Sequence, residues 1–361
     1  MIAFILGTRA ELIKTFTVMK ELDKRNIPWV FIHTGQHNIE ELRKEFEVKK
    51  PKIKLDFTEE KSGRFKGNLF KSVVKASVWN FKITRKLRNV ISEIKPKVVL
   101  CQGDTMATAA AAIASRSIFL NRPLIGHIEA GIRTYDLFEP FPEEISRRIT
   151  DKLSDLLFAP TIRAVKNLRR EIKFGKIFLT GNTIVDAVNY IVKKRCEKPK
   201  KRKYVIAQIH RQENVNSYKR MKKFVDLITN LPYKVLLIVH SNTLYKLKEF
   251  GLWKELEKSN IEILDLMGYS KFIGYLKNSL GIITDSGGLA EECTILKKPC
   301  LIFREKTERP EAIEAGVATL VINKNIDFIL NFLERKIRNT GNPFGKVGVS
   351  KKIVDIIEDY I

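Results

Sequence analysis

Acidic side chains follow two apolar segments in the first half of the chain. Asp104 comes shortly after segment 97–101, and Glu129 comes shortly after segment 124–127. Glu143 follows a proline at the start of an expected helix. Carboxylates at such points can serve as general acids and bases. Structural roles stay open, since Asp104 could cap the next helix and the helix dipole would stabilise Glu143.

The second half of the chain carries a histidine and a glycine pair at equivalent points. His210 follows segment 204–208, where a lone histidine is as compatible with a structural role as with catalysis. Ser286, Gly287 and Gly288 stand where a strand ends and a helix begins. Backbone amides there can approach a diphosphate closely, because glycine has no Cβ. Glu292, one turn deeper, could accept hydrogen bonds from ribose hydroxyls.

Cationic side chains add to this pattern. A turn led by Gly7 opens a helix that carries Arg9 and Lys14, and free backbone N–H groups there would suit a phosphate. The turn matches neither the dinucleotide fingerprint nor the Walker motif, so these cofactors are not expected. Arg304 and Arg309 follow segment 300–303 and offer further positive charge.

A metal site has little support in the sequence. His33 and His37 have helical spacing, but a glycine between them argues against a helix. Asp104, Glu129, His127 and His210 could supply nitrogen and oxygen ligands, yet no dense ligand motif is present. The four cysteines show no CxxC spacing, so neither structural zinc nor a disulfide framework is expected. We therefore expect a metal-free protein without a cofactor.

Short apolar segments alternate with helical segments throughout the chain, in two series. The expected strands are 2–6, 29–33, 97–101, 124–127, 156–159 and 176–179, then 204–208, 235–239, 261–264, 281–284, 300–303 and 319–322. The expected helices include 10–24, 69–94, 145–152, 218–230 and 327–338. Such alternation predicts parallel sheets covered on both faces, in two doubly wound α/β domains divided near 196–203. Ligands of such sheets bind beyond the carboxyl ends of the strands.

Length and composition agree with a two-domain globular protein of 361 residues with 44% hydrophobic residues. No apolar run is long enough to span a bilayer, and the first residues do not resemble a signal peptide, so we expect a soluble cytoplasmic protein with no membrane partner. The formal charge of +25 raises the possibility of nucleic-acid binding. The basic residues are nevertheless spread over helix faces. The one dense run, 193–203, is interpreted first as a linker.

A set of motifs in a fixed order gives the sharpest indication of function. They are GTRAE (7–11), HTGQH (33–37), QGDT (102–105), HIEAGIRT (127–134), PEEISRR (142–148), LTGNTIVDA (179–187), HRQEN (210–214), DSGGLAEE (285–292) and TERPEA (307–312). Together they resemble the non-hydrolysing UDP-N-acetylglucosamine 2-epimerases from end to end.

The resemblance implies a glycosyltransferase-B-like fold with two Rossmann-like domains and an interdomain active site. We expect residues 1–180 plus 346–361 in the first domain, with the C-terminal helix crossing back, and residues 181–345 in the second. It also implies reversible conversion of UDP-GlcNAc to UDP-ManNAc, through elimination of UDP to 2-acetamidoglucal and its re-addition. A homodimer is expected on the same basis.

The resemblance also assigns roles to residues that match its motifs. Asp104, Glu129 and Glu143 match the catalytic carboxylates, and His210 matches the catalytic histidine. The matches to UDP-binding positions are Arg9, Lys14, Ser286, Gly287, Gly288, Glu292 and Arg309, with Phe272 a contact on the uracil side.

Several positions depart from the family pattern. Ala10 replaces a proline, Gln102 stands where many members have histidine, and Ser146 replaces an asparagine. Ile39 occupies a position that is polar in members with a regulatory UDP-GlcNAc site, which argues against that regulation. Segment 61–68 matches the usual loop poorly.

Three other functions stay open at this point. A UDP-sugar glycosyltransferase would use the DSGG segment but leave the carboxylates unexplained. A hydrolysing epimerase would release UDP and free ManNAc. A basic nucleic-acid-binding protein is favoured only by the net charge.

Overall fold

A computed structural model describes residues 1–57, 69–118, 120–135, 142–194, 203–257, 259–337 and 341–361, with the side chains of 69–78 left undescribed. The chain divides into two compact units. Unit 1 comprises Met1–Ala187 and Phe344–Ile361, and unit 2 comprises Val188–Pro343.

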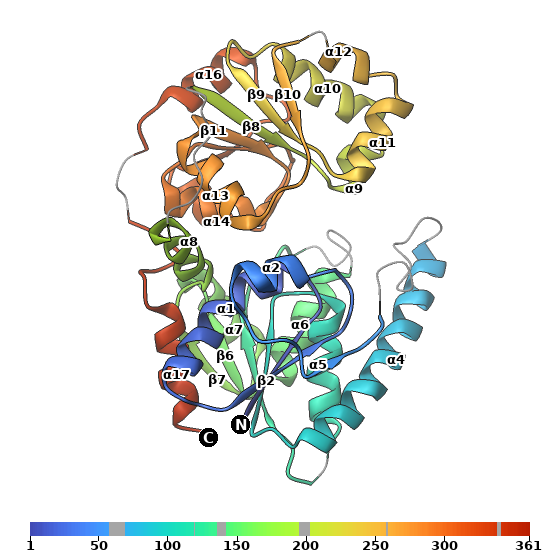
Figure 1. Ribbon diagram of the computed structural model, residues 1–361, viewed down its shortest axis with the longest axis vertical. Helices are drawn as coiled ribbons and strands as arrows, with labels where there is room; N and C mark the ends of the chain where they lie inside the picture. The colour runs from blue at the N-terminus through green and yellow to red at the C-terminus, as the bar shows by residue number, and fades with distance from the viewer. Residues whose placement is uncertain (58–68, 119, 136–141, 195–202, 258, 338–340) are drawn as a thin grey trace. The chain divides into compact units, whose positions relative to one another are not determined.

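Unit 1 is built on a parallel sheet in the order β3-β2-β1-β4-β5-β6-β7. Figure 1 labels β2, β6 and β7 of this sheet. Its strands are β1 Ile2–Leu6, β2 Trp29–His33, β3 Ile53–Lys54, β4 Val98–Gln102, β5 Leu124–Ile128, β6 Leu156–Ala159 and β7 Lys176–Leu179. Strands β1 and β4 are buried along their whole length, as expected for a sheet covered on both faces.

The helices of unit 1 form two packed groups. They are α1 Arg9–Lys24, α2 Glu40–Glu45, α4 Leu69–Ile94, α5 Met106–Arg116, α6 Glu143–Leu153, α7 Ile162–Glu171 and α17 Val349–Glu358, with α8 Ile184–Lys193 at the unit boundary. Helix α5 packs against both α4 and α6, and α1 packs against α17. The alanines of α5 allow this close packing, since most of them are fully buried.

Unit 2 carries a second parallel sheet, in the order β10-β9-β8-β11-β12-β13. Its strands are β8 Tyr204–Gln208, β9 Lys234–Ile238, β10 Ile261–Leu264, β11 Gly281–Thr284, β12 Cys300–Ile302 and β13 Ala318–Leu320. Its helices are α9 Gln212–Val215, α10 Tyr218–Thr229, α11 Ser241–Glu249, α12 Trp253–Glu257, α13 Tyr269–Asn278, α14 Gly287–Leu296, α15 Pro310–Glu314 and α16 Ile326–Glu334. The predicted α/β class with two doubly wound parallel sheets is confirmed.

Strand β3 is the one strand of the described residues that the sequence did not predict. Its two residues extend the sheet edge, where Ile53 pairs with Ile32 of β2. A strand this short contains no apolar run or alternation, so no sequence pattern marks it. Helix α16 also ends earlier than expected, at Glu334, because Arg335 adopts an extended backbone.

The C-terminal segment belongs to unit 1. The Asp186 carboxylate accepts hydrogen bonds from the backbone of Gly348 at 2.7 Å and Ser350 at 2.6 Å. Arg25 at the end of α1 forms an ion pair with Asp355 of α17 at 2.6 Å. These contacts explain why unit 1 extends to Ala187 and resumes at Phe344, rather than dividing at the expected residues 180 and 345.

Some sequence-based expectations fall on residues outside the described ranges. Segment 61–68, Cys196 and most of the basic run 193–203 lie there. Among the helices that are described, none combines the length and apolar character needed to cross a membrane.

Candidate active site

Glu129 lies at the carboxyl end of β5 and is 7% exposed. Its Oε1 accepts a hydrogen bond from Lys14 Nζ at 2.6 Å, and its Oε2 accepts one from the Gln102 amide. A Cβ added at Gly103 would lie 4.0 Å from Glu129 Oε2, which places this carboxylate beside the residue that precedes Asp104. Two of the three expected catalytic carboxylates therefore come from adjacent loops of one sheet edge.

The backbone at Glu129 is in the left-handed region, with φ +73°. Few non-glycine residues adopt this conformation, and it persists where the surroundings hold it. Here the amides of Glu129 and Ala130 both donate to the carbonyl of Phe158, each at 3.1 Å. With the backbone in this conformation, the carboxylate lies against Lys14 and Gln102.

Asp104 follows β4 and is about one-third exposed at its side chain. It does not cap α5, because Thr105 is the N-cap and accepts the Thr108 amide at 3.2 Å. Its carboxylate instead forms an ion pair with Arg147 of α6. The structural alternative of a capping aspartate is therefore wrong.

Helix α6 carries the third expected carboxylate, Glu143, in its first turn, partly buried. The neighbouring Glu144 is fully buried and accepts hydrogen bonds from Thr134 N at 3.1 Å and Arg148 at 3.1 Å. Arg147, one turn after Glu143, joins this helix to Asp104. Sequence reasoning missed Arg147, although its i+4 spacing from Glu143 would have placed both on one helix face.

The first turn of α1 does not offer the free amides that the sequence suggested. Glu11 Oε2 accepts the amides of Gly7 and Thr8, each at 2.7 Å, in a capping box with the Thr8 side chain. Glu11 Oε1 accepts the Thr105 hydroxyl at 2.7 Å, which ties the loops after β1 and β4 together. Burial raises the pKa of Glu11, against the lowering effect of these donors. The amides of Gly7 and Thr8 are thus satisfied within the protein, while phosphate binding by Arg9 and Lys14 at this turn stays a prediction.

The two cations of this turn have different surroundings. Lys14 is buried against Glu129, so its charge stabilises that carboxylate. Arg9 is partly exposed at the N-terminus of α1 and forms no ion pair with the residues that the structure describes. Arg9 is thus the cation of this loop that is available to a ligand.

In unit 2, the loop that carries His210 is anchored by Asp285. This fully buried carboxylate accepts the backbone amides of His210 at 3.1 Å and Arg211 at 2.9 Å, and the Asn214 side chain at 3.0 Å. His210 Nδ1 lies 3.4 Å from Asp285 Oδ1, and its side chain is 38% exposed. Asp285 therefore orients a histidine that solvent and ligands can reach. Its place in the DSGG segment, directly after a strand, was the signal that sequence reasoning overlooked.

Helix α14 begins with an open first turn. Its N-cap, Ser286, makes no side-chain capping bond. A Cβ at Gly288 would meet only Ser286 Oγ, at 3.9 Å, so Gly288 faces open space. A Cβ at Gly287 would lie 2.2 Å from Glu308 Oε1, so Gly287 is required by packing. Free amides and the helix dipole favour an anion at this turn.

The other expected nucleotide contacts of unit 2 surround α14. Glu292 is 6% exposed and accepts the Tyr269 hydroxyl at 2.9 Å. Phe272 lies on α13, one turn from Tyr269, and α13 packs against α14. Arg309, at the start of α15, forms a buried ion pair with Glu291 of α14. Phe272, Glu292, Arg309 and the Ser286 turn are thus brought together.

A cluster that the sequence did not indicate lies behind the Ser286 turn. Glu308 is buried and contacts Arg304 at 2.5 Å and Arg211 at 3.1 Å, with Gly287 against its carboxylate. Arg304 is therefore neutralised within unit 2 by Glu308. The suggestion that it offers free positive charge to a ligand is wrong.

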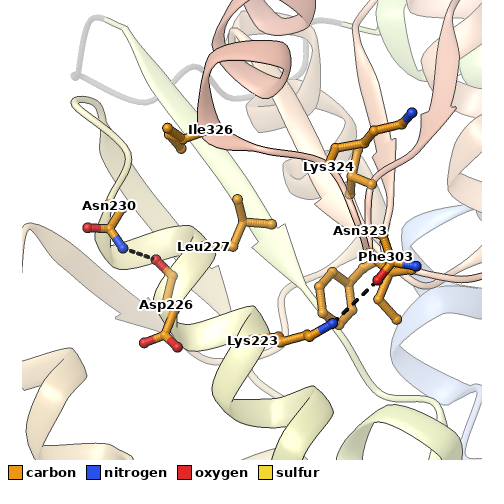
Figure 2. A pocket seen from close by; sticks show the side chains of 10 residues that line it. Lys223, Asp226, Leu227, Asn230, Phe303, Asn323, Lys324 and Ile326 are labelled. Atoms are coloured by element: carbon orange, nitrogen blue, oxygen red, sulfur yellow. Dashed lines mark hydrogen bonds between the residues drawn. The ribbon is translucent and has the colours of Figure 1, made fainter.

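A separate cavity of about 340 Å³ lies on unit 2, away from these residues. Its lining comprises Lys223, Asp226, Leu227, Asn230, Phe303, Val321, Ile322, Asn323, Lys324 and Ile326. Figure 2 shows two polar pairs there, Lys223 with Asn323 at 3.3 Å and Asn230 with the Asp226 carbonyl at 2.7 Å. None of the expected site residues lines it. Within the described ranges, no group of acidic, histidine or cysteine side chains is arranged to hold a metal ion.

Comparison with known proteins gives consistent matches. The family model for UDP-N-acetylglucosamine 2-epimerase matches residues 20–358. An enzyme of that name from Methanococcus maripaludis is 37% identical, covering 99% of this chain and 98% of its own.

Solved structures agree with this match. The Methanocaldococcus jannaschii UDP-GlcNAc 2-epimerase, crystallised with UDP-GlcNAc and UDP, has a TM-score of 0.85 and 35% identity, and the match covers 99% of both chains. The Neisseria meningitidis enzyme bound to UDP-GlcNAc has a TM-score of 0.83 and 31% identity, again covering 99% of both chains.

Proposed function

This chain belongs to the UDP-N-acetylglucosamine 2-epimerase family, and on that premise we propose that it interconverts UDP-GlcNAc and UDP-ManNAc without net hydrolysis. The observation that carries the proposal is the similarity, along 99% of both chains, to a UDP-GlcNAc 2-epimerase solved with UDP-GlcNAc and UDP. The carboxylates Asp104 and Glu129 at neighbouring strand ends of unit 1 support the chemistry.

The reaction we propose has two half-reactions. In the first, a carboxylate takes the proton from C2 of the sugar while the bond between C1 and the diphosphate oxygen breaks. The C2–H electron pair forms the C1=C2 double bond of 2-acetamidoglucal, and UDP leaves with the electrons of the C1–O bond. In the second, the UDP oxygen adds back to C1 and C2 receives a proton on the opposite face. No co-reactant is consumed.

The proton transfers are assigned to unit 1 in this proposal. The C2 proton is weakly acidic, so its removal must be coupled to departure of UDP. Asp104, Glu129 and Glu143 are the proposed acid and base groups. Glu129 is buried and has Lys14 and Gln102 on its two oxygens, which keeps it oriented as an acceptor. Such preorganisation stabilises developing charge in the transition state.

Nucleotide binding is assigned to unit 2. Ser286, Gly287 and Gly288 are the proposed diphosphate contacts, because the first turn of α14 has no side-chain cap. The Ser286 amide itself donates to Thr284 Oγ1 at 3.1 Å, so the amides of Gly287 and Gly288 are the ones that suit the diphosphate. Glu292 is the proposed acceptor for ribose hydroxyls, and Phe272 lies on the uracil side. His210 is exposed and oriented by Asp285, as a group that assists departure of UDP would need to be. Arg309 supports this site, while Arg9 of unit 1 adds a cation for the diphosphate.

Incubation of the pure protein with UDP-GlcNAc in D₂O tests the proposal. We expect deuterium at C2 of the recovered UDP-sugars and a mixture of the two epimers. Free hexosamine with UDP would instead identify a hydrolysing epimerase. Unlabelled, unchanged UDP-GlcNAc would contradict the proposal, and would fit a transferase without acceptor or a nucleic-acid-binding protein.

We also propose that the enzyme works in the cytoplasm as a homodimer, on the basis of the family resemblance. Light scattering after size-exclusion chromatography should give about twice the chain mass of 41.6 kDa. A mass equal to that of one chain would contradict the dimer and leave the proposed reaction untouched.

A further inference from the structure

His127, at the end of β5, is fully buried and has a hydrogen-bond partner on each ring nitrogen. Its Nδ1 lies 2.7 Å from Asp151 Oδ1 on α6, and its Nε2 lies 2.8 Å from the backbone carbonyl of Gly103. The ring therefore bridges α6 and the loop after β4.

The chemistry of these two partners fixes the role of each nitrogen. A backbone carbonyl can only accept a hydrogen bond, so Nε2 must carry a proton. Burial alone would raise the pKa of Asp151, but the hydrogen bond from His127 and the charge of Arg133 lower it below its usual value. The Arg133 guanidinium at 2.7 Å and the Gly131 amide at 3.2 Å both favour an ionised Asp151 carboxylate, so Nδ1 donates to it and carries a proton as well. A ring with two donating nitrogens is an imidazolium.

Charged groups around the ring balance this positive charge. Asp151 Oδ2 lies 2.7 Å from Arg133 and accepts the Gly131 amide at 3.2 Å. Arg133 in turn pairs with Glu171 at 3.0 Å. The cluster of His127, Asp151, Arg133 and Glu171 is an alternating set of two cations and two anions. The attraction between opposite charges in such a set offsets the desolvation cost of burying them.

The same contacts hold both loops that carry proposed catalytic carboxylates. Gly103 has φ +75° and precedes Asp104, and its carbonyl is one of the two acceptors of the His127 ring. Gly131 has φ +85°, follows Glu129 by two residues and is held by Asp151. Glycine adopts positive φ without strain and has many accessible conformations, so these contacts select the one that each loop takes.

We infer that His127 is a positioning residue for the carboxylates of Asp104 and Glu129, acting as a buried imidazolium that joins Gly103 to Asp151. The inference deepens the proposed function and rests on it, since positioning matters only if these carboxylates react. His127 itself touches no reacting atom.

Nitrogen NMR tests the protonation of the ring without reference to turnover. The chain has five histidines, so a ¹⁵N-histidine-labelled sample gives few signals. Substitutions of the other four assign His127 by elimination. At neutral pH we expect both of its nitrogens to show the chemical shift of a protonated ring nitrogen. One bare nitrogen would overturn the inference.

Substitution of the ring tests positioning. His127→Phe keeps the volume and loses both donors, and we expect turnover to fall ~10²-fold with unchanged UDP affinity, because small misplacement of catalytic groups has effects of that size. His127→Gln retains an amide donor and should recover part of the rate. The matched control is Ser115→Ala, which removes another buried hydrogen bond of unit 1, from Ser115 to the Ala111 carbonyl at 2.8 Å. The control should keep full turnover.

The outcomes separate the two proposals. Normal turnover in folded His127→Phe overturns the positioning role, as does a loss that Ser115→Ala reproduces. If His127→Phe does not fold, the nitrogen spectrum of the unsubstituted protein decides on the imidazolium. The turnover of His127→Gln then decides on positioning. A rate below that of the wild type supports the role, and a wild-type rate contradicts it. Failure of the unsubstituted protein to epimerise contradicts the proposed function, and the spectrum still tests the ring.

Discussion

Helices α1 and α5 of unit 1 and helix α14 of unit 2 begin at corresponding edges of two parallel sheets, yet their first turns differ. In unit 1, Thr8 and Thr105 each cap a helix by accepting one first-turn amide, of α1 and α5 respectively. The Glu11 side chain also accepts the amides of Gly7 and Thr8. No side chain caps α14, and Gly288 in its first turn faces open space. Uncapped N–H groups need an external acceptor, so the open turn is the one suited to a phosphate.

The ionisable groups follow the same division. In unit 1, Glu129 and Asp104 are paired with Lys14 and Arg147 of the same unit. In unit 2, His210 is oriented through its backbone but its side chain is 38% exposed. Unit 1 thus holds its carboxylates in buried or partly buried ion pairs, while unit 2 exposes the His210 side chain.

The largest expected effect comes from removing a proposed catalytic carboxylate of unit 1. Glu129→Gln retains the shape but cannot accept a proton, so we expect turnover to fall ~10³-fold. UDP affinity, measured by calorimetry, should stay within about twofold, because the nucleotide contacts of the proposal, on unit 2 and at Arg9, do not include Glu129. Glu93→Gln, on the exposed face of α4, is the matched control and should be fully active. Unchanged turnover in Glu129→Gln would remove this residue from the mechanism.

Acid sensitivity should separate a buried strand-end histidine from the exposed His210. Burial lowers the pKa of His33 from 6.5 to about 4. The fold favours the neutral ring, so its contribution is complete above pH 6.5 and is lost as the pH falls towards 4. The loss reaches about 3 kcal/mol at most. Urea unfolding at several pH values should show this loss in the wild type and not in His33→Phe. An equal change of the unfolding free energy with pH in the two proteins would refute this role of His33.

The glycine pair of α14 sharpens the comparison within unit 2. Gly287→Ala forces the Glu308 carboxylate away from Arg304, and we expect it to destabilise unit 2 by ~2 kcal/mol. Gly288→Ala meets no close atom and should leave stability unchanged. Its methyl group would still obstruct a diphosphate, so UDP affinity should fall about tenfold. Thermal unfolding measures the stability of both variants, and calorimetry measures their UDP affinity. Full UDP affinity in Gly288→Ala would place the diphosphate elsewhere.

The smallest expected effect tests the capping difference directly. Thr105→Ala removes the cap of α5 and its bond to Glu11, and should cost about 1 kcal/mol of unfolding free energy. Ser286→Ala removes no capping bond, so the stability of the free protein should not change. Equal losses in the two variants would show that the two first turns are alike after all.

Much of the fold was predictable because its parallel strands are buried on both faces. Segments such as 2–6 and 204–208 are continuous apolar runs, and the structure has strands at these residues. Strand β3 was not predictable, since two residues are too few to show an apolar run or an alternation. The neighbourhood of Glu129 was equally hidden, because Lys14 is distant from it in the sequence and meets it only through the packing of β1, β4 and β5.

The sequence alone determined the alternation of strands and helices, the residues at the strand ends and the order of the family motifs. Hydrophobic periodicity is local, and motifs are read residue by residue. Tertiary structure decided which of those residues are satisfied within the protein and which stay open. Gly7 looks as suited to a ligand as Gly288 until the Glu11 carboxylate is placed, which accepts the Gly7 amide and is itself held by Thr105 of a distant loop. Hydrogen-bond donors and acceptors are satisfied in three dimensions, so only the folded chain distinguishes a closed turn from a binding site.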